Sequence, residues 1–192
     1  SSSTYGDHRV LPKVEGTIGN PLSPYAVSKL VNELYAQVFY KTYGTPIIGL
    51  RYFNVFGPKQ SPNGAYAAVI PLFMESLKQN VSPIIHGDGE QTRDFTFVEN
   101  AVQANIRSFF APNNAINEVY NVACGNRISL NTLWSHLKSI AGINLSANYG
   151  PSRKGDVKDS LADISKAKRL LNYNPEFAVK EGIELTWKKF KR

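Results

Sequence analysis

Cysteine, histidine and long apolar stretches are all scarce in this chain of 192 residues. The single cysteine, Cys124, excludes an internal disulfide and is typical of a protein of the reducing cytoplasm. The three histidines are scattered without metal-ligand spacing, so we predict no metal site. No apolar run reaches the roughly 18 residues of a membrane span, and no signal-peptide pattern opens the chain. We therefore expect a cytoplasmic protein without a membrane partner.

A glycine-rich dinucleotide fingerprint is also missing. The nearest pattern, Gly87-Asp88-Gly89, lacks the third glycine and precedes a strand-like segment, where the fingerprint would open a helix. The chain begins without methionine, at residues that are typical of the end of a strand. We expect a fragment whose N-terminal part is missing.

The composition is that of an ordinary globular protein, with 42% apolar and 19% charged residues. The length allows one domain or one and a half. The formal net charge of +7 could serve nucleic acid, but the basic residues form no recognisable nucleic-acid motif. A basic cleft for a phosphorylated small molecule explains the charge equally well, and we expect no nucleic-acid partner.

Apolar patterning predicts alternating strands and helices. Two i,i+4 apolar rows run from Ser23 to Tyr43, with Gly44 as a stop, which predicts a long helix buried on two sides. The apolar run at 46–53 predicts a buried parallel strand, and strand, helix, strand is the rhythm of a βαβ unit. Further helices are expected at 65–79, 99–111, 129–141, after Asp163 and from Val179, and strands at 84–86, 93–98, 119–123 and 145–149.

One stretch combines a helix start with a candidate acid–base pair. Ser23 is a good N-cap, and Pro24 suits the first helical position. Tyr25 and Lys29 then lie four residues apart on one helical face. The ammonium charge favours the phenolate, so Tyr25 is a candidate proton acceptor near neutral pH. On these residues alone the alternative stays open, which is an exposed tyrosine and lysine on an amphipathic helix.

Three serine hydroxyls stand upstream of this pair, at Ser1, Ser2 and Ser3. Ligands of parallel α/β sheets bind at the carboxyl ends of strands, so a hydroxyl there could meet a tyrosine at the start of the next helix. The serine would share a substrate hydroxyl, Tyr25 would take its proton, and Lys29 would hold the phenolate. A serine-rich turn without chemistry is the alternative.

Two arginines are suited to bidentate phosphate binding. Arg93 follows the Gly-Asp-Gly turn, and Arg153 lies in a polar loop at 150–160. The alternative is a pair of solvated surface arginines.

Several motifs in order resemble one known family. They are Ser-Ser-Ser-Thr-Tyr-Gly, Ser-Pro-Tyr-Ala-Val-Ser-Lys, Leu-Arg-Tyr-Phe-Asn-Val-Phe-Gly-Pro, Gly-Asp-Gly-x-x-x-Arg-Asp-Phe and Arg-x-Gly-Asp. Together they resemble the extended short-chain dehydrogenase/reductase family, and within it the UDP-N-acetylglucosamine 4-epimerases, over essentially the whole chain. The resemblance implies an α/β fold with the C-terminal part of a Rossmann-type parallel sheet in residues 1–57. It also implies a smaller mixed α/β domain in 58–192, with 94–111 packing back on the Rossmann part.

The resemblance implies NAD as cofactor, a UDP-sugar as substrate and a homodimer for the full-length protein. Tyr25 would be the catalytic base, and Lys29 would bind the nicotinamide ribose. The catalytic hydroxyl would be Ser1, with Ser2 as the alternative. The implied cofactor-binding residues are Tyr25, Lys29, Tyr52, Phe53 and Val55, although Phe53 could equally pack into the core.

The implied sugar-nucleotide residues extend over both parts of the chain. Arg93 and Arg153 would grip the diphosphate, and Asp156 would accept a hydrogen bond from a ribose hydroxyl. Ile84 and His86 would cradle the uracil. The full set is Ser1, Ser2, Ser3, Tyr25, Asn54, Gln60, Ala68, Val69, Ile84, His86, Arg93, Arg153, Asp156 and Ser160.

Ser160 bears on substrate choice. It lies where epimerases that reject N-acetyl sugars carry a bulky residue, so its small side chain favours N-acetylated substrates by steric exclusion. A loop serine without substrate contact is the alternative. The implied reaction is NAD-dependent C4 epimerisation of UDP-GlcNAc and UDP-GalNAc through a 4-keto intermediate.

Three alternatives remain beside this reaction. They are epimerisation of UDP-glucose or UDP-glucuronate, 4,6-dehydration or a related decarboxylation, and a catalytically incomplete binding fragment. Dehydratases carry Asp-Glu after the catalytic Thr, whereas Ser2, Ser3 and Thr4 stand here, which argues against dehydration. We also expect this fragment alone to be inactive and the helix after Ser23 to expose its apolar stripe.

Overall fold

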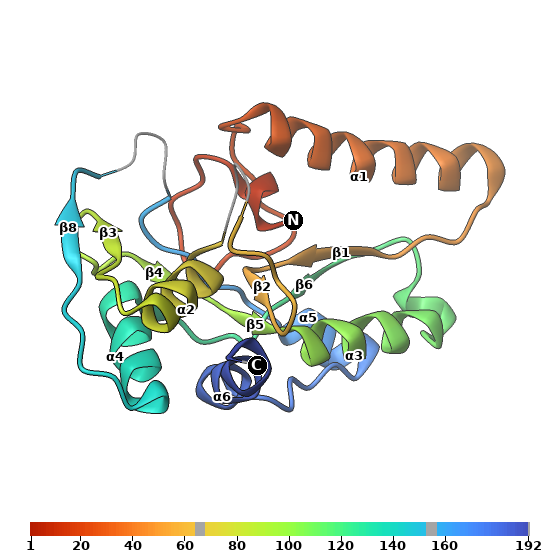
Figure 1. Ribbon diagram of the computed structural model, residues 1–192. Coiled ribbons are helices and arrows are strands. Elements are labelled where there is room, and N and C mark those ends of the chain that lie inside the picture. Colours follow the sequence, from red (N-terminus) through yellow and green to blue (C-terminus); the bar gives the residue numbers. More distant parts are fainter. Residues whose placement is uncertain (64–67, 153–156, 192) are drawn as a thin grey trace.

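In the computed structural model, which describes residues 1–63, 68–152 and 157–191, a parallel strand pair lies between helices (Figure 1). Strand β1 (Gly49–Tyr52) pairs with β6 (Val119–Val122), with Gly49 opposite Val119. Helix α1 (Pro24–Tyr43) lies over one face, and α3 (Val98–Phe109) and α5 (Ser165–Leu171) lie under the other (Figure 1). This three-layer arrangement confirms the predicted α/β fold class.

Helix α1 begins and ends where its local signals predict. The Ser23 hydroxyl accepts a hydrogen bond from the backbone N–H of Ala26 at 3.1 Å, and Pro24 takes the first helical position. Gly44 ends the helix at a φ of 68°, a left-handed conformation that glycine adopts without steric penalty. The start of α1, and with it Tyr25, is therefore fixed by local chemistry.

The remaining strands form three further pairs. Strand β2 (Val55–Phe56) runs parallel to β5 (Thr96–Phe97), and β3 (Ile84–His86) runs parallel to β8 (Asn148–Gly150). Strand β4 (Thr92–Arg93) is antiparallel to β7 (Ile128–Ser129). Around them lie α2 (Val69–Gln79), α4 (Leu130–Ala141) and α6 (Val179–Phe190), and two 3₁₀ helices are η1 (Ser2–Tyr5) and η2 (Asn113–Ala115).

Two hydrophobic clusters make up the core of the described part of the chain. One lies at the β1–β6 sheet and includes Tyr5, Phe53 and Tyr173. The other, among α2, α4 and α6, includes Trp134 and Trp187. The first cluster draws residues from 162–173 as well as from the start of the chain. The domain boundary near residue 57 stays a prediction.

Several sequence-based expectations are wrong in detail. Residues 1–5 do not end a strand, because Ser1 Oγ accepts from the N–H of Ser3 and Gly6 N–H bonds to Ser3 O, which folds the segment into η1. The expected strand at 93–98 splits into β4 and β5 on either side of Asp94-Phe95. Pro71 lies in the first turn of α2, where its missing N–H has no helical partner.

Helix α1 is not buried on two sides, since Ala26 is its only buried residue among those described. Most of its apolar rows are exposed, as expected for this chain by itself, because no described element packs against its outer surface. The exposed row members are Val27, Val31, Leu34, Tyr35, Val38 and Phe39, and Tyr40 and Tyr43 are exposed beside them.

Candidate active site

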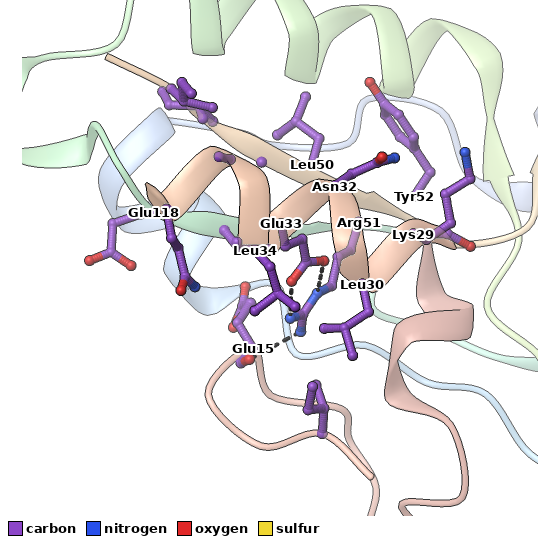
Figure 2. A pocket seen from close by; sticks show the side chains of 18 of the residues that line it. Glu15, Lys29, Leu30, Asn32, Glu33, Leu34, Leu50, Arg51, Tyr52 and Glu118 are labelled. Atoms are coloured by element: carbon purple, nitrogen blue, oxygen red, sulfur yellow. Dashed lines mark hydrogen bonds and ion pairs between the residues drawn. The ribbon is translucent and has the colours of Figure 1, made fainter. Parts of the chain in front are cut away.

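A cavity of about 1240 Å³ opens between α1 and β1 (Figure 2). Helix α1, strand β1 and the first residues of the chain all contribute to its walls. The predicted site residues that line it are Ser1, Ser2, Tyr25, Lys29, Tyr52, Asn54 and Val55. The fold thus gathers serine hydroxyls, the phenol and the ammonium around one space.

Tyr25 and Lys29 lie on the first two turns of α1. The Lys29 Nζ atom lies 5.3 Å from the centroid of the Tyr25 ring, within the range of a cation–π contact. The Tyr25 side chain is 53% exposed and borders the cavity. The phenol is therefore accessible to a ligand, with a positive charge beside its ring.

The serine turn is organised by its own hydroxyls. Ser1 Oγ and Ser3 Oγ lie 2.9 Å apart, and the Thr4 hydroxyl donates to Ser1 O at 2.8 Å. Thr4 is fully buried. Ser1 and Ser2 line the cavity, so both alternatives for the catalytic hydroxyl stay open.

The end of β1 directs three neighbouring residues differently. The Tyr52 hydroxyl donates to Asn105 Oδ1 on α3 at 3.0 Å. Phe53 is 1% exposed and packs against the Tyr5 ring, so it lies in the core and not on the cavity wall. Asn54 adopts a positive φ of 39° and donates through Nδ2 to the carbonyl oxygen of Asp94 at 2.9 Å.

A second cavity of about 510 Å³ lies beside the first. Its walls come from α2, β3 and the β4 region and are mostly apolar, as is typical of small-molecule pockets. The predicted substrate residues that line it are Asn54, Ala68, Val69, Ile84, His86 and Arg93. Asn54 and Val55 line both cavities, so the two spaces meet at these residues.

Polar side chains of the second cavity are held in place by backbone carbonyls. Arg93 Nη1 donates to Thr92 O at 2.8 Å and to Lys158 O at 3.0 Å. Gln91 Nε2 donates to His86 O at 2.5 Å, and His86 Nδ1 lies 3.2 Å from Pro151 O. A guanidinium on a mostly apolar wall suits a phosphorylated ligand with one flat, uncharged part.

Five predicted substrate residues lie outside both cavity walls or outside the described chain. Ser3, whose hydroxyl lies 2.9 Å from that of Ser1, lines neither cavity. Gln60 donates through Nε2 to Val55 O at 3.2 Å and lines neither cavity. Ser160 is partly buried and donates its backbone N–H to Thr92 O at 3.1 Å, beside β4. Arg153 and Asp156 lie outside the described residues, so their roles stay predictions.

A buried ion pair on the wall of the first cavity was not predicted from the sequence. Arg51 Nε and Nη2 donate to the two carboxylate oxygens of Glu33 at 2.8 and 2.7 Å (Figure 2). Burial lowers the pKa of Arg51, but the hydrogen bonds that Arg51 donates to Glu33, together with the charge interactions with Tyr5 and Glu33, outweigh it and hold the pKa above its ordinary value. A charged residue inside the apolar strand 46–53 was the available signal, because such a residue needs a buried partner.

Asp94 was missed as well. Its carboxylate accepts backbone N–H bonds from Cys124, Gly125 and Ala162 at 3.0–3.2 Å and is fully buried. Burial raises the pKa of Asp94 to about 7, against the lowering effect of these donors. The carboxylate joins the β4–β5 connection to the loop after β6 and to the segment that follows Ser160.

Within residues 1–63, 68–152 and 157–191, no cluster of three or more His, Cys, Asp or Glu side chains could hold a metal ion. No described helix has both the length and the apolar character of a membrane span.

Comparison with known proteins places these cavities in context. The family model of GDP-mannose 4,6-dehydratase matches residues 1–186. A curated relative, a putative UDP-glucose 4-epimerase of Methanocaldococcus jannaschii, is 40% identical over 189 residues, which cover 97% of this chain and 60% of that protein.

Solved structures agree with this match. A UDP-N-acetylglucosamine 4-epimerase from Methanobrevibacter ruminantium, in complex with UDP-N-acetylmuramic acid, superposes with a TM-score of 0.94 at 40% identity, covering 99% of this chain and 60% of its own. A UDP-glucuronic acid 4-epimerase from Bacillus cereus, in complex with UDP-glucuronic acid and NAD, superposes with a TM-score of 0.90 at 34% identity, covering 100% of this chain and 59% of its own. The chain thus spans about 60% of the length of the proteins it matches.

Proposed function

This chain belongs to the GDP-mannose 4,6-dehydratase family of extended short-chain dehydrogenases/reductases, and we propose that it carries the catalytic tyrosine and the sugar-nucleotide pocket of an NAD-dependent UDP-N-acetylhexosamine 4-epimerase. One observation carries the proposal. The cavity of Tyr25 and Lys29 meets the cavity of Arg93 at Asn54 and Val55. A nucleotide in the second cavity could therefore extend its sugar towards the phenol.

The residues of the first cavity suit a proton transfer at a sugar hydroxyl. Tyr25 would take the proton of the 4-hydroxyl, and Ser1 or Ser2 would hydrogen-bond the same oxygen. Lys29, next to the Tyr25 ring, would stabilise the negative charge of the phenolate. Tyr25 would return the proton after the 4-keto sugar has presented its opposite face, and C4 would then be inverted.

The same cavity fits the nicotinamide end of NAD, which supplies hydride acceptance and return when it is bound. Lys29 would hydrogen-bond the ribose, and Tyr52 and Val55 would line the ring site. NAD is the cofactor seen in the Bacillus cereus relative. The 192 residues hold no glycine-rich fingerprint for the pyrophosphate, so the proposal applies to a protein of the relatives' full length.

The second cavity suits the nucleotide diphosphate. Its apolar wall at Ile84 and Val69 would take the uracil, and Arg93 would face the phosphates. Arg153 and Asp156 are proposed to complete the site from outside the described residues. The N-acetylated substrate is supported by the Methanobrevibacter ruminantium relative. The small side chain at Ser160 favours it from the sequence resemblance alone, because Ser160 lines neither cavity. The glucose and glucuronate relatives supply the alternative substrates.

Dehydration is the main competing reaction, since it gives the matching family model its name. The serine turn argues against it, because Ser2, Ser3 and Thr4 stand where a dehydratase would carry its acidic pair. The discriminating observation is the product that NMR detects from UDP-GlcNAc and NAD. A C4 epimer supports the proposal, and a 4-keto-6-deoxy sugar contradicts it.

Two further parts of the proposal concern assembly and binding. The exposed apolar surface of α1 is proposed to pair with a second copy in a homodimer. Titration calorimetry with UDP-GlcNAc and with NAD tests which of the two ligands the 192-residue chain binds. We expect binding of the sugar nucleotide and no tight binding of NAD. The cytoplasmic location stays a prediction.

A further inference from the structure

Arg51 lies at the centre of a buried network that touches both halves of the candidate acid–base unit. Its side chain is 5% exposed and that of Glu33 is 14% exposed. Besides the two bonds to Glu33, Arg51 Nη1 donates to Glu15 O at 3.0 Å (Figure 2). The guanidinium carbon also lies 4.8 Å from the centroid of the Tyr5 ring.

The Glu33 bonds tie down the helix that carries the catalytic pair. Tyr25, Lys29 and Glu33 follow one another at intervals of four residues, so they lie along one face of α1. A bidentate arginine–carboxylate pair fixes both the rotation of a helix about its axis and its position along it. The anchor stands one turn beyond Lys29 and two turns beyond Tyr25.

The Tyr5 contact ties down the serine turn. Tyr5 ends η1, and its hydroxyl donates to Asn121 Oδ1 on β6 at 2.7 Å. Asn121 in turn donates its N–H to Glu15 Oε1 at 2.9 Å. Both segments that carry the acid–base groups thus rest on one guanidinium.

We propose that Arg51, through Glu33 and Tyr5, is a positioning residue that sets the location of Tyr25 and Lys29 relative to the serine hydroxyls. This inference rests on the proposed function. It differs from a general contribution to stability, because Arg51, Glu33 and Glu15 line the first cavity, whereas no residue of the network lines the second. Losing it should affect turnover and leave nucleotide binding unchanged.

The test uses the full-length enzyme with Arg51→Lys and with the double variant Arg51→Met/Glu33→Leu. Lysine keeps the charge but cannot form the two parallel bonds. The double variant removes both charges, which avoids an unpaired buried ion and retains folding. A displacement of about 1 Å in an active site lowers turnover by about 100-fold. We expect a loss of that order in kcat for both variants, with the dissociation constant for UDP within about twofold of wild type.

A stability-matched control separates the two explanations. Leu137→Ala opens a void in the other core cluster, at a residue that itself lines neither cavity. Below its unfolding temperature, the Leu137→Ala enzyme should keep wild-type kcat, although we expect its unfolding temperature to be lower than that of the double variant. A double variant with wild-type kcat, or with kcat and UDP affinity reduced together, overturns the inference. A wild-type enzyme that epimerises no UDP-sugar contradicts the proposed function instead, and UDP affinity still reports on the second cavity.

Discussion

The side-chain amide of Asn54 donates to the backbone carbonyl of Asp94 at 2.9 Å, and this bond joins the wall between the two cavities to the strand region of Arg93. Asn54 reaches this position with a φ of 39°. The junction therefore depends on a side-chain bond and on an uncommon backbone conformation at once.

The two contributions of Asn54 can be separated by substitution. Asn54→Gly keeps the backbone conformation and loses the amide bond, so the free energy of unfolding should fall by about 1 kcal/mol. Asn54→Val loses the same bond and adds strain at positive φ, which should lower the free energy of unfolding by roughly 1–3 kcal/mol more. Urea denaturation measures both. Equal losses in the two variants would show that the backbone conformation is unimportant.

Asp94 should make stability depend on pH. Because burial raises its pKa from 3.8 to about 7, the folded state binds this proton more tightly than the unfolded chain does. Its contribution to stability is therefore fully present below pH 3.8 and is lost as the pH rises towards 7. The slope reaches at most about 1.4 kcal/mol per pH unit.

Asp94→Asn removes this titration. We expect the wild-type free energy of unfolding, measured by urea denaturation, to decline relative to that of the variant between about pH 4 and pH 7. Cys124 and Tyr173 interact electrostatically with Asp94. The pKa values of both groups are raised, so both stay neutral in this pH range. Parallel curves for the two proteins would refute the prediction.

Arg93 should contribute most of the phosphate affinity from the described residues. Arg93→Ala removes a charge-assisted bond worth about 1.5–3 kcal/mol, so the dissociation constant for UDP should rise by about 10- to 100-fold. The control is Arg127→Ala. Arg127 is a partly exposed arginine that lines neither cavity and pairs with Asp159 at 3.7 Å. Calorimetry should give the Arg127→Ala protein a dissociation constant for UDP within about twofold of wild type. Equal losses of affinity in the Arg93 and Arg127 variants would indicate general charge attraction.

The outer face of α1 should mediate self-association. Tyr35 and Phe39 lie one turn apart, are 62% and 46% exposed, and line neither cavity. Tyr35→Glu with Phe39→Glu should convert a dimer of the full-length protein into a monomer in sedimentation velocity, because charges disfavour an apolar interface. Val81→Glu, at a residue 57% exposed on another surface, should leave the dimer intact. An unchanged dimer in the double variant would place the interface elsewhere.

Local chemistry explains which elements could be predicted from the sequence. Ser23, Pro24 and Gly44 act within one turn of the residues they cap, so the bounds of α1 were predictable. Ser129 caps α4 in the same way, with a bond from Thr132 N–H at 3.1 Å. The motif residues that line the two cavities were likewise named from the sequence.

Long-range contacts explain what could not be predicted. Glu33 and Arg51 are 18 residues apart, and Asp94 and Ala162 are 68 apart. Neither pair shares a helix face or a strand register, so no local pattern predicts which two residues meet. Residues 1–5 were predicted to end a strand, but the hydroxyl of Ser1 closes a short hydrogen-bonded turn there. The sequence of three serines does not distinguish such a turn from a strand end.

Replacement of Tyr25 by phenylalanine in the full-length enzyme is the most direct test of the proposed base. Phenylalanine keeps the ring beside Lys29 and removes only the hydroxyl. Turnover of UDP-GlcNAc, followed by NMR of the C4 epimer, should fall by about 10²- to 10⁴-fold, with UDP affinity unchanged. Tyr43→Phe, at the far end of the same helix and 70% exposed, should turn over like wild type. Wild-type turnover in the Tyr25→Phe enzyme would contradict the account.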